Sequence, residues 1–195
     1  MSFRNRFWQI LLILSTLAFS WLAMQVVHEA GHVAHLLAAG GTIEQITLHP
    51  LKLSHTLPNT NPHPLITVLG GPVWGVLLPL LAWWIVKNVS PARAYLALFF
   101  AGFCLVANGT YLVGDAVLQG GDGREFVQHG VPPWTLIAAG LPAVVAGLYA
   151  WNGLGPRFGL ADSRGHVNAV DATTMAALAV VVVLAELAVL FVRLP

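Results

Sequence analysis

The amino-acid sequence predicts an all-α fold, a polytopic transmembrane helical bundle of about five spans. The chain has 195 residues, of which 57% are hydrophobic and only 9% are charged. A soluble domain carries about 25% charged residues, so this chain has too few to cover a surface that faces water. Much of its surface is therefore expected to face a lipid bilayer. Without a basic tract, the sequence gives no indication of a nucleic-acid partner.

Five stretches are apolar enough, and long enough, to cross a bilayer, which takes about 20 mostly apolar residues. The segments between them hold most of the charged residues and many of the prolines and glycines, as loops do. We therefore expect residues 1–195 to form a single integral membrane domain. The five predicted spans cover residues 7–39, 65–86, 94–118, 134–151 and 172–192.

The basic residues predict which side of the membrane each loop occupies. If the N-terminus lies inside, the inner segments hold six Lys and Arg residues and the outer segments hold three. This bias favours an N-in, C-out orientation by the positive-inside rule. Low charge and high Ala, Gly and Val content are typical of a bacterial inner membrane, where we expect the chain to reside. The inner residues are Arg4, Arg6, Lys87, Arg93, Arg157 and Arg164, and the outer ones are Lys52, Arg124 and Arg193.

A histidine motif lies in the last third of the first predicted span. The residues from His28 to His32 read His-Glu-Ala-Gly-His, which fits the pattern H-E-x-x-H. Residues four apart lie on the same face of a helix, so both imidazoles can bind one metal ion, and Glu29 can reach a water on it. Zinc suits this set, with Glu29 as general base. Three ionisable groups in an apolar helix cost several kcal/mol unless they are paired or metal-bound, which favours a metal site.

The remaining ligand must come from another segment, because two histidines leave a zinc site one protein ligand short. A carboxylate is the natural third, and the third span returns to the side where the first one ends. Asp115 and Asp122 are therefore the two candidates. Asn108 can hydrogen-bond a substrate carbonyl or developing oxyanion, or it can tie two helices together. His35 shares the face of His28 and is either a further ligand, a substrate contact or a polar group satisfied near the membrane surface.

These residues together resemble the site-2-protease, or M50, family of membrane metallopeptidases. Residues 70–72 read Gly-Gly-Pro and are similar to the glycine-proline motif of the next helix in that family. Asn108 is followed by an Asp-Gly pair at Asp122, which resembles the family's Asn…Asp-Gly motif. The histidine-rich loop 42–64 stands where family members place membrane-associated strands, so a loop or short hairpin is expected there. The resemblance covers about residues 20–130, the three-helix catalytic core.

The resemblance implies a zinc-dependent intramembrane endopeptidase that hydrolyses peptide bonds of membrane-bound proteins or peptides. It implies that the third zinc ligand is Asp122, because the aspartate of the Asn…Asp-Gly motif has that role in the family. Together with the histidine motif, it implies Zn²⁺ ligands at His28, His32 and Asp122, and a general base at Glu29.

The sequence departs from the family pattern at three places. The proline-rich approach to the family's Asp-Gly pair is replaced here by residues 114–121, which contain no proline. Position 75 is a glycine where the family often has asparagine, and the spacing from Asn108 to Asp122 is long, so that Asp115 suits the spacing better. The alternative function is a non-catalytic membrane protein that binds a metal or a partner. A metal transporter would need polar groups that cross several spans, whereas here they gather towards one side.

Overall fold

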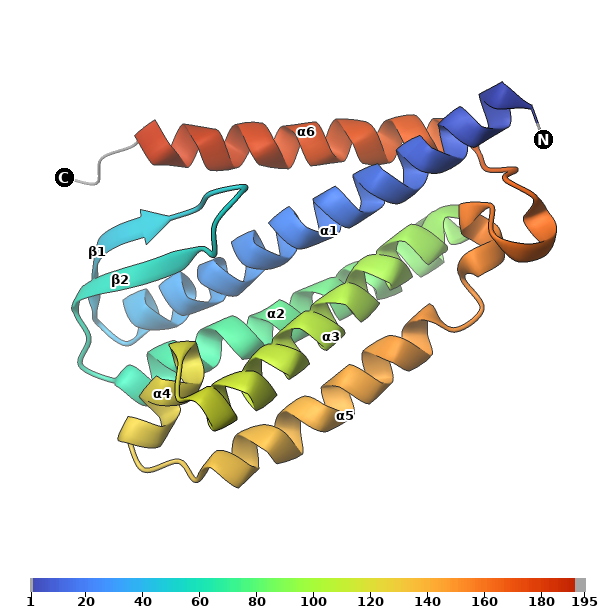
Figure 1. Cartoon of the computed structure of the whole chain (residues 1–195). Helices are drawn as coiled ribbons and strands as arrows, with labels where there is room; N and C mark the ends of the chain where they lie inside the picture. The colour runs from blue at the N-terminus through green and yellow to red at the C-terminus, as the bar shows by residue number, and fades with distance from the viewer. Residues whose placement is uncertain (1, 192–195) are drawn as a thin grey trace.

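The computed structural model describes residues 2–191 and confirms the all-α bundle with a short hairpin after the first span (Figure 1). Five of its helices are long and apolar enough to cross a membrane, as a multi-pass membrane protein requires. They are α1 (Phe3–Ala38), α2 (Pro64–Val89), α3 (Ala94–Leu118), α5 (Pro133–Trp151) and α6 (Ala169–Phe191). Strands β1 (Thr42–Thr47) and β2 (His55–Thr60) pair antiparallel, and α4 (Gly121–Gln128) is a short helix.

The predicted spans agree with the observed helices to within a few residues. The third prediction, 94–118, coincides with α3, whereas α1 begins four residues before its predicted start. This early start has a local cause, since the Ser2 hydroxyl accepts a hydrogen bond from the Asn5 backbone N–H at 3.3 Å and caps the helix. Val192, the predicted end of the last span, and Arg193 lie outside the described residues.

The long helices lie side by side in the order α6, α1, α2, α3, α5. Helix α2 contacts both α1 and α3, α6 lies along α1, and α5 lies along α3. Glycines allow the close contact between α3 and α5, because a Cβ at Gly109 would meet the Gly140 carbonyl oxygen. The hairpin lies beside the C-terminal half of α1, and α4 folds back beside the end of α3 (Figure 1).

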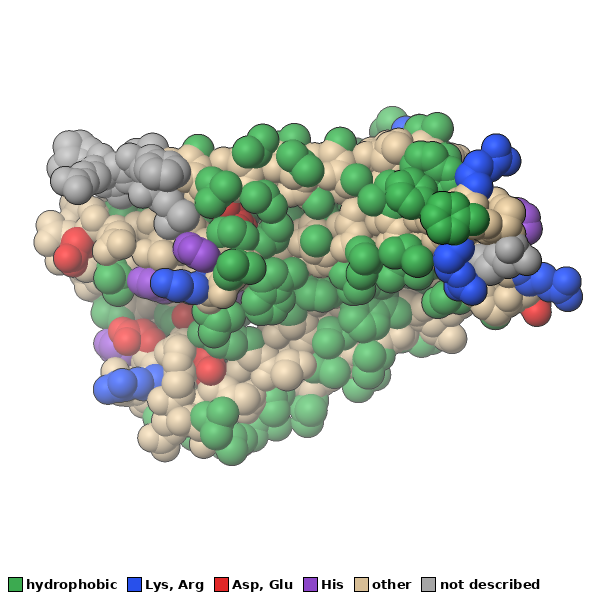
Figure 2. Space-filling model, turned by 45° about the horizontal axis from the view of Figure 1, so that its top comes forward, with side chains coloured by type: hydrophobic (Ala, Val, Ile, Leu, Met, Phe, Trp, Pro, Cys, Tyr) green, Lys and Arg blue, Asp and Glu red, His purple; other side chains and the backbone are tan. Residues whose placement is uncertain are grey.

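Charge is distributed unevenly between the two ends of the bundle (Figure 2). Helices α1, α3 and α6 begin at the end where α2 and α5 finish, so all six basic residues predicted to lie inside gather there. The opposite end, with the hairpin and α4, carries Lys52 and Arg124. Between the ends, large apolar side chains such as Leu14, Leu77 and Leu148 are exposed, as expected for a surface in contact with lipid.

Candidate metal centre

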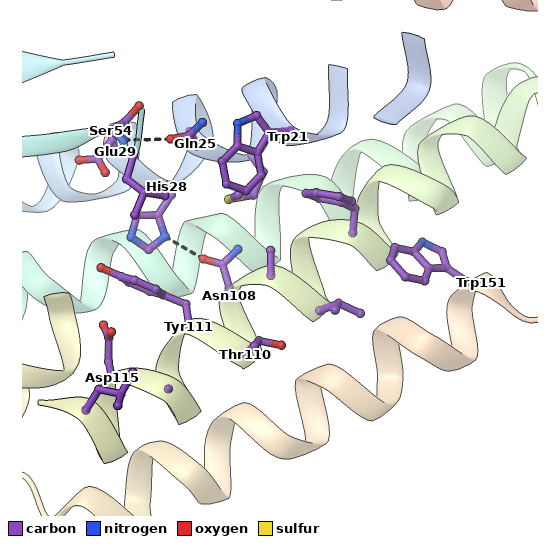
Figure 3. Close-up of a pocket in the computed structure, with 17 residues that line it drawn as sticks. Trp21, Gln25, His28, Glu29, Ser54, Asn108, Thr110, Tyr111, Asp115 and Trp151 are labelled. Carbon is purple, nitrogen blue, oxygen red and sulfur yellow. Dashed lines mark hydrogen bonds between the residues drawn. The ribbon is translucent and has the colours of Figure 1, made fainter. Parts of the chain in front are cut away.

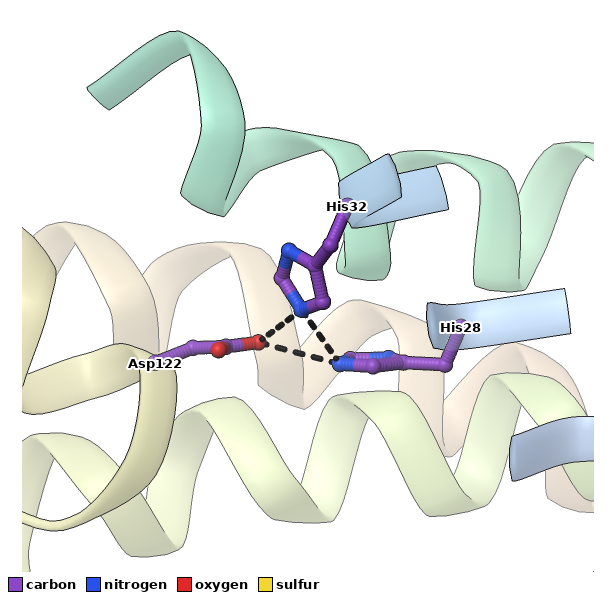
Figure 4. Close-up of side chains that lie close together, drawn as sticks. All are labelled: His28, His32 and Asp122. Carbon is purple, nitrogen blue, oxygen red and sulfur yellow. Dashed lines mark hydrogen bonds and ion pairs between the residues drawn. The ribbon is translucent and has the colours of Figure 1, made fainter. Parts of the chain in front are cut away.

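Two histidines of α1 and one aspartate of α4 converge on a single point (Figure 4). The Nε2 atoms of His28 and His32 lie 3.1 Å apart, and Asp122 Oδ2 lies 3.0 Å from the first and 3.3 Å from the second. Two atoms that bind a tetrahedral zinc ion at about 2.0–2.1 Å are about 3.3–3.4 Å apart. The three ligand atoms therefore have the spacing that a small cation needs, and this group can hold a metal ion.

The turn between α3 and α4 brings Asp122 back to α1. Gln119 has a left-handed backbone with φ of 51°, and Gly121 follows with φ of 44°, so the chain reverses within a few residues. Asp115 holds this turn, because its Oδ2 accepts a hydrogen bond from the Gly123 backbone N–H at 3.2 Å. Of the two acids that the sequence left as candidates, Asp122 joins the histidines, and Asp115 supports the turn that carries it.

Hydrogen bonds to the other ring nitrogens fix the orientation of both imidazoles. His32 Nδ1 donates to the Thr67 carbonyl oxygen at 3.0 Å, since a carbonyl can only accept. His28 Nδ1 lies 2.7 Å from Asn108 Oδ1. The Asn108 amide nitrogen donates to the carbonyl oxygens of Gly75 and Cys104, which identifies the atom facing His28 as the oxygen.

This pattern leaves the Nε2 atoms as the lone-pair acceptors of both rings. They meet a carboxylate oxygen at about 3 Å, and three acceptors at such separations are stable only around a cation, either a metal ion or a shared proton. Donation from Nδ1 to a carbonyl or amide oxygen is the arrangement that orients metal-binding histidines in proteins.

Glycines of α2 provide the space beneath the imidazoles. A Cβ at Gly71 would meet the Nε2 atoms of both histidines, and one at Gly75 would meet the Asn108 amide. The two helices touch through their backbones where Gly31 faces Gly70. The glycines at positions 70, 71 and 75 thus allow close packing within the molecule around the three ligand residues.

The Asp122 carboxylate is in the form that binds a metal. Burial alone would raise its pKa. In the metal-free site, a proton shared at the Nε2 atoms makes hydrogen bonds and charge interactions between the imidazoles of His28 and His32 and this carboxylate, and these lower the pKa of Asp122 to about 2. The carboxylate also lies in the first turn of α4, where the helix dipole favours a negative charge. Asp122 is therefore ionised at neutral pH.

The hairpin supplies a hydrogen-bond donor to Glu29, which follows the first histidine of the motif. The Thr56 hydroxyl of β2 donates to Glu29 Oε2 at 2.8 Å, and the Ser54 backbone N–H donates to Gln25 Oε1 at 2.9 Å. Glu29 itself is only 6% exposed. The hairpin therefore covers this side of the centre and orients the carboxylate.

A cavity of about 580 Å³ adjoins the metal centre between α1 and α3 (Figure 3). His28, Glu29 and Asn108 line one end of it, and Tyr111 packs edge-on against the His28 ring with 5.8 Å between ring centroids. The rest of the wall is largely apolar, formed by residues such as Trp21, Met24, Phe103, Val106 and Trp151. The volume lies within the range of small-molecule and cofactor sites, about 300–1,000 Å³.

The structure assigns contacts to two residues whose roles the sequence left open. Asn108 uses its oxygen on His28 and its nitrogen on two carbonyls, so its observed role is to orient a histidine and join helices. His35 Nδ1 donates to the Ile66 carbonyl oxygen at 2.7 Å, and its Nε2 accepts from Trp74 Nε1 at 3.1 Å. Both ring nitrogens of His35 are engaged, which leaves no lone pair for a metal.

Sequence reasoning missed three residues of the site. Thr56 of the hairpin donates its hydroxyl to Glu29, and the backbone carbonyl of Thr67 accepts from His32. Neither contact could be predicted from a pattern in the sequence. Tyr111 had a signal in the sequence, because it lies three positions after Asn108 and therefore on the same face of α3.

Comparison of this chain with protein-family models, curated proteins and solved structures finds no match.

Proposed function

We propose that this chain is a zinc-dependent intramembrane endopeptidase, as its resemblance to the site-2-protease family implies. One observation carries the proposal. Two imidazoles with oriented lone pairs and an ionised carboxylate form a three-ligand site, and Glu29 lies beside it in the wall of the same cavity. Three protein ligands with a neighbouring acid are typical of catalytic zinc sites, which keep a fourth position for water or substrate.

Each residue of the site has a role in this chemistry. A zinc ion bound by the three ligands would polarise the scissile carbonyl and lower the pKa of a bound water towards 7. Glu29 would take a proton from the attacking water and give it to the amine that leaves as the C–N bond breaks. The Thr56 hydroxyl holds one carboxylate oxygen of Glu29, so the other is available to the water.

The apolar cavity supports a membrane-bound protein or peptide as substrate. Side chains such as Trp21 and Phe103 line the same cavity as His28 and offer apolar contacts there, and apolar side chains of a membrane segment would fill this space. A helical segment must first unwind, because its intrahelical hydrogen bonds shield the scissile carbonyl. We therefore expect cleavage near a helix end or break. Both N–H groups of the Asn108 amide are engaged with backbone carbonyl oxygens, so they are not free to donate to the substrate carbonyl.

The test separates catalysis from metal binding. Glu29→Gln removes the proton acceptor but leaves the three metal ligands, so it is expected to retain zinc while lowering the rate of peptide cleavage by about 10²–10⁴-fold. Cleavage would be measured on fluorogenic apolar peptides in proteoliposomes. Glu44→Gln is the matched control, because Glu44 is exposed on β1 and belongs neither to the cavity lining nor to the three metal ligands.

Two outcomes would contradict the proposal in different ways. If Glu29→Gln cleaved as fast as the wild type, Glu29 would not be the base. If the wild-type protein bound zinc but cleaved no peptide of a diverse apolar set, the alternative of a non-catalytic, metal- or partner-binding membrane protein would replace it.

A further inference from the structure

A second pocket lies at the opposite end of the bundle from the metal centre. Its volume is about 840 Å³, and it is enclosed by the α2–α3 connection, the first turn of α3, the segment between α5 and α6, and the start of α6. Its polar lining includes Arg93, Arg157, His166, Asn168 and Asp171. Because spanning helices begin and end here, the pocket lies at the depth of lipid headgroups.

A buried carboxylate fixes one arginine at this pocket. Asp171 is 4% exposed and accepts hydrogen bonds from the Tyr95 hydroxyl at 2.9 Å and from Arg93 Nε at 3.2 Å. Only Nε of Arg93 is used in this pair. The two terminal NH₂ groups of its guanidinium have no partner among the described residues, so a held guanidinium still offers donors to a ligand.

A second arginine faces the same group of residues. The Arg157 guanidinium lies 6.0 Å from the centroid of the Tyr95 ring, and it makes no ion pair in the part of the chain that the structure describes. Two arginines around one buried acid leave the pocket with a net positive charge. The other cations at this end add to that potential, since Arg4, Arg6, Lys87 and Arg164 lie there with only one further acid among residues 2–191, Asp162.

We propose that this pocket binds the phosphate group of an anionic phospholipid, with Arg93 and Arg157 as its cationic ligands. Guanidinium groups bind phosphate oxygens through paired, charge-assisted hydrogen bonds. Basic pockets between transmembrane helices at the headgroup layer are where anionic lipid headgroups bind. A bound headgroup would join the α2–α3 connection to the α5–α6 connection, and so would stabilise the packing of α6 on the bundle.

The test measures thermal unfolding of the detergent-purified protein during titration with a lipid. Phosphatidylglycerol is expected to raise the unfolding midpoint in a saturable way, whereas phosphatidylcholine with the same acyl chains is not. Arg157→Gln is expected to weaken the apparent affinity for phosphatidylglycerol by about tenfold or more. Arg157→Lys, which keeps the charge, should restore part of it. Arg157 is exposed, and each variant's response is measured against its own midpoint without lipid.

Lys87→Gln is the matched control. It removes the same charge from the same end of the bundle, at a residue outside the pocket, and is expected to retain the wild-type affinity. Equal weakening by Lys87→Gln would mean that only overall surface charge attracts the lipid, which would overturn the proposal. An equal rise of the unfolding midpoint with inorganic phosphate would show that the pocket binds free phosphate, and would overturn the proposal of a lipid headgroup. No response of the wild type to phosphatidylglycerol would also overturn it.

Discussion

At the scale of single residues, the candidate site depends on which ring nitrogen of each histidine carries the proton. His28 and His32 could be predicted as a pair because the four-residue spacing is a local property of a helix. Their partners could not, since Thr67 acts through a backbone carbonyl and Asn108 comes from a helix 80 positions away. The choice between Asp115 and Asp122 was likewise undetermined by spacing, because it depends on a reversal of the chain at Gln119 and Gly121.

Removal of the oxygen that orients His28 should weaken metal binding. Asn108→Ala leaves His28 Nδ1 without its acceptor, and loss of such a partner typically lowers metal affinity by about 10–100-fold. The affinity would be measured by competition with a chromophoric zinc chelator. Asn88→Ala is the control, because Asn88 is exposed on α2 and bonds only the Trp84 carbonyl oxygen. An unchanged affinity in Asn108→Ala would show that the tautomer of His28 is set in another way.

At the scale of elements, hydropathy predicted the five long helices because each is apolar over enough residues to cross a bilayer. The two short elements at the metal end depend on tertiary contacts. The hairpin is linked to α1 through Thr56 and Gln25, and α4 is only eight residues long, with Phe126 buried against the core. Hydropathy carries little information on such elements, although the resemblance placed strands in this loop.

Helix α2 packs closely against the imidazoles of His28 and His32, so a larger residue at the contact should disturb the metal site. Gly71→Ala places a methyl group against the Nε2 atoms of His28 and His32, and overpacking of this kind costs about 1–3 kcal/mol. We expect the variant to lose most of its bound zinc and to keep its helical circular dichroism.

Gly114→Ala is the control for that substitution. It lies in α3, where an added Cβ meets no atom within 4 Å, so zinc content should be unchanged, and stability should not fall because Ala favours a helix more than Gly does. Full zinc content in Gly71→Ala would mean that Gly71 of α2 does not pack against the imidazoles of His28 and His32.

At the scale of the whole molecule, the polar chemistry divides between two ends. The metal centre, the hairpin and α4 lie at one end, and the six inner basic residues lie at the other. The positive-inside rule therefore predicts that the metal end faces outward. The sequence could supply this prediction because loop charges are read directly from it, without knowledge of the packing.

The single cysteine makes this orientation testable. Cys104 is fully buried, so introduced thiols at exposed positions can be labelled selectively. In intact expressing cells, a membrane-impermeant maleimide is expected to label Leu51→Cys in the hairpin loop and to leave Val89→Cys, at the basic end, unlabelled until the cells are lysed. The reverse pattern would place the metal centre towards the cytoplasm.

The most direct test of the central claim is the zinc content of the detergent-purified protein, measured by elemental mass spectrometry. The geometry predicts about one zinc per chain in the wild type, lost in His28→Ala and in Asp122→Asn. Asp115→Asn, which can still accept the Gly123 hydrogen bond, should retain it. A folded wild-type protein without metal, or loss of zinc in Asp115→Asn but not in Asp122→Asn, would contradict the assignment of His28, His32 and Asp122 as the metal site.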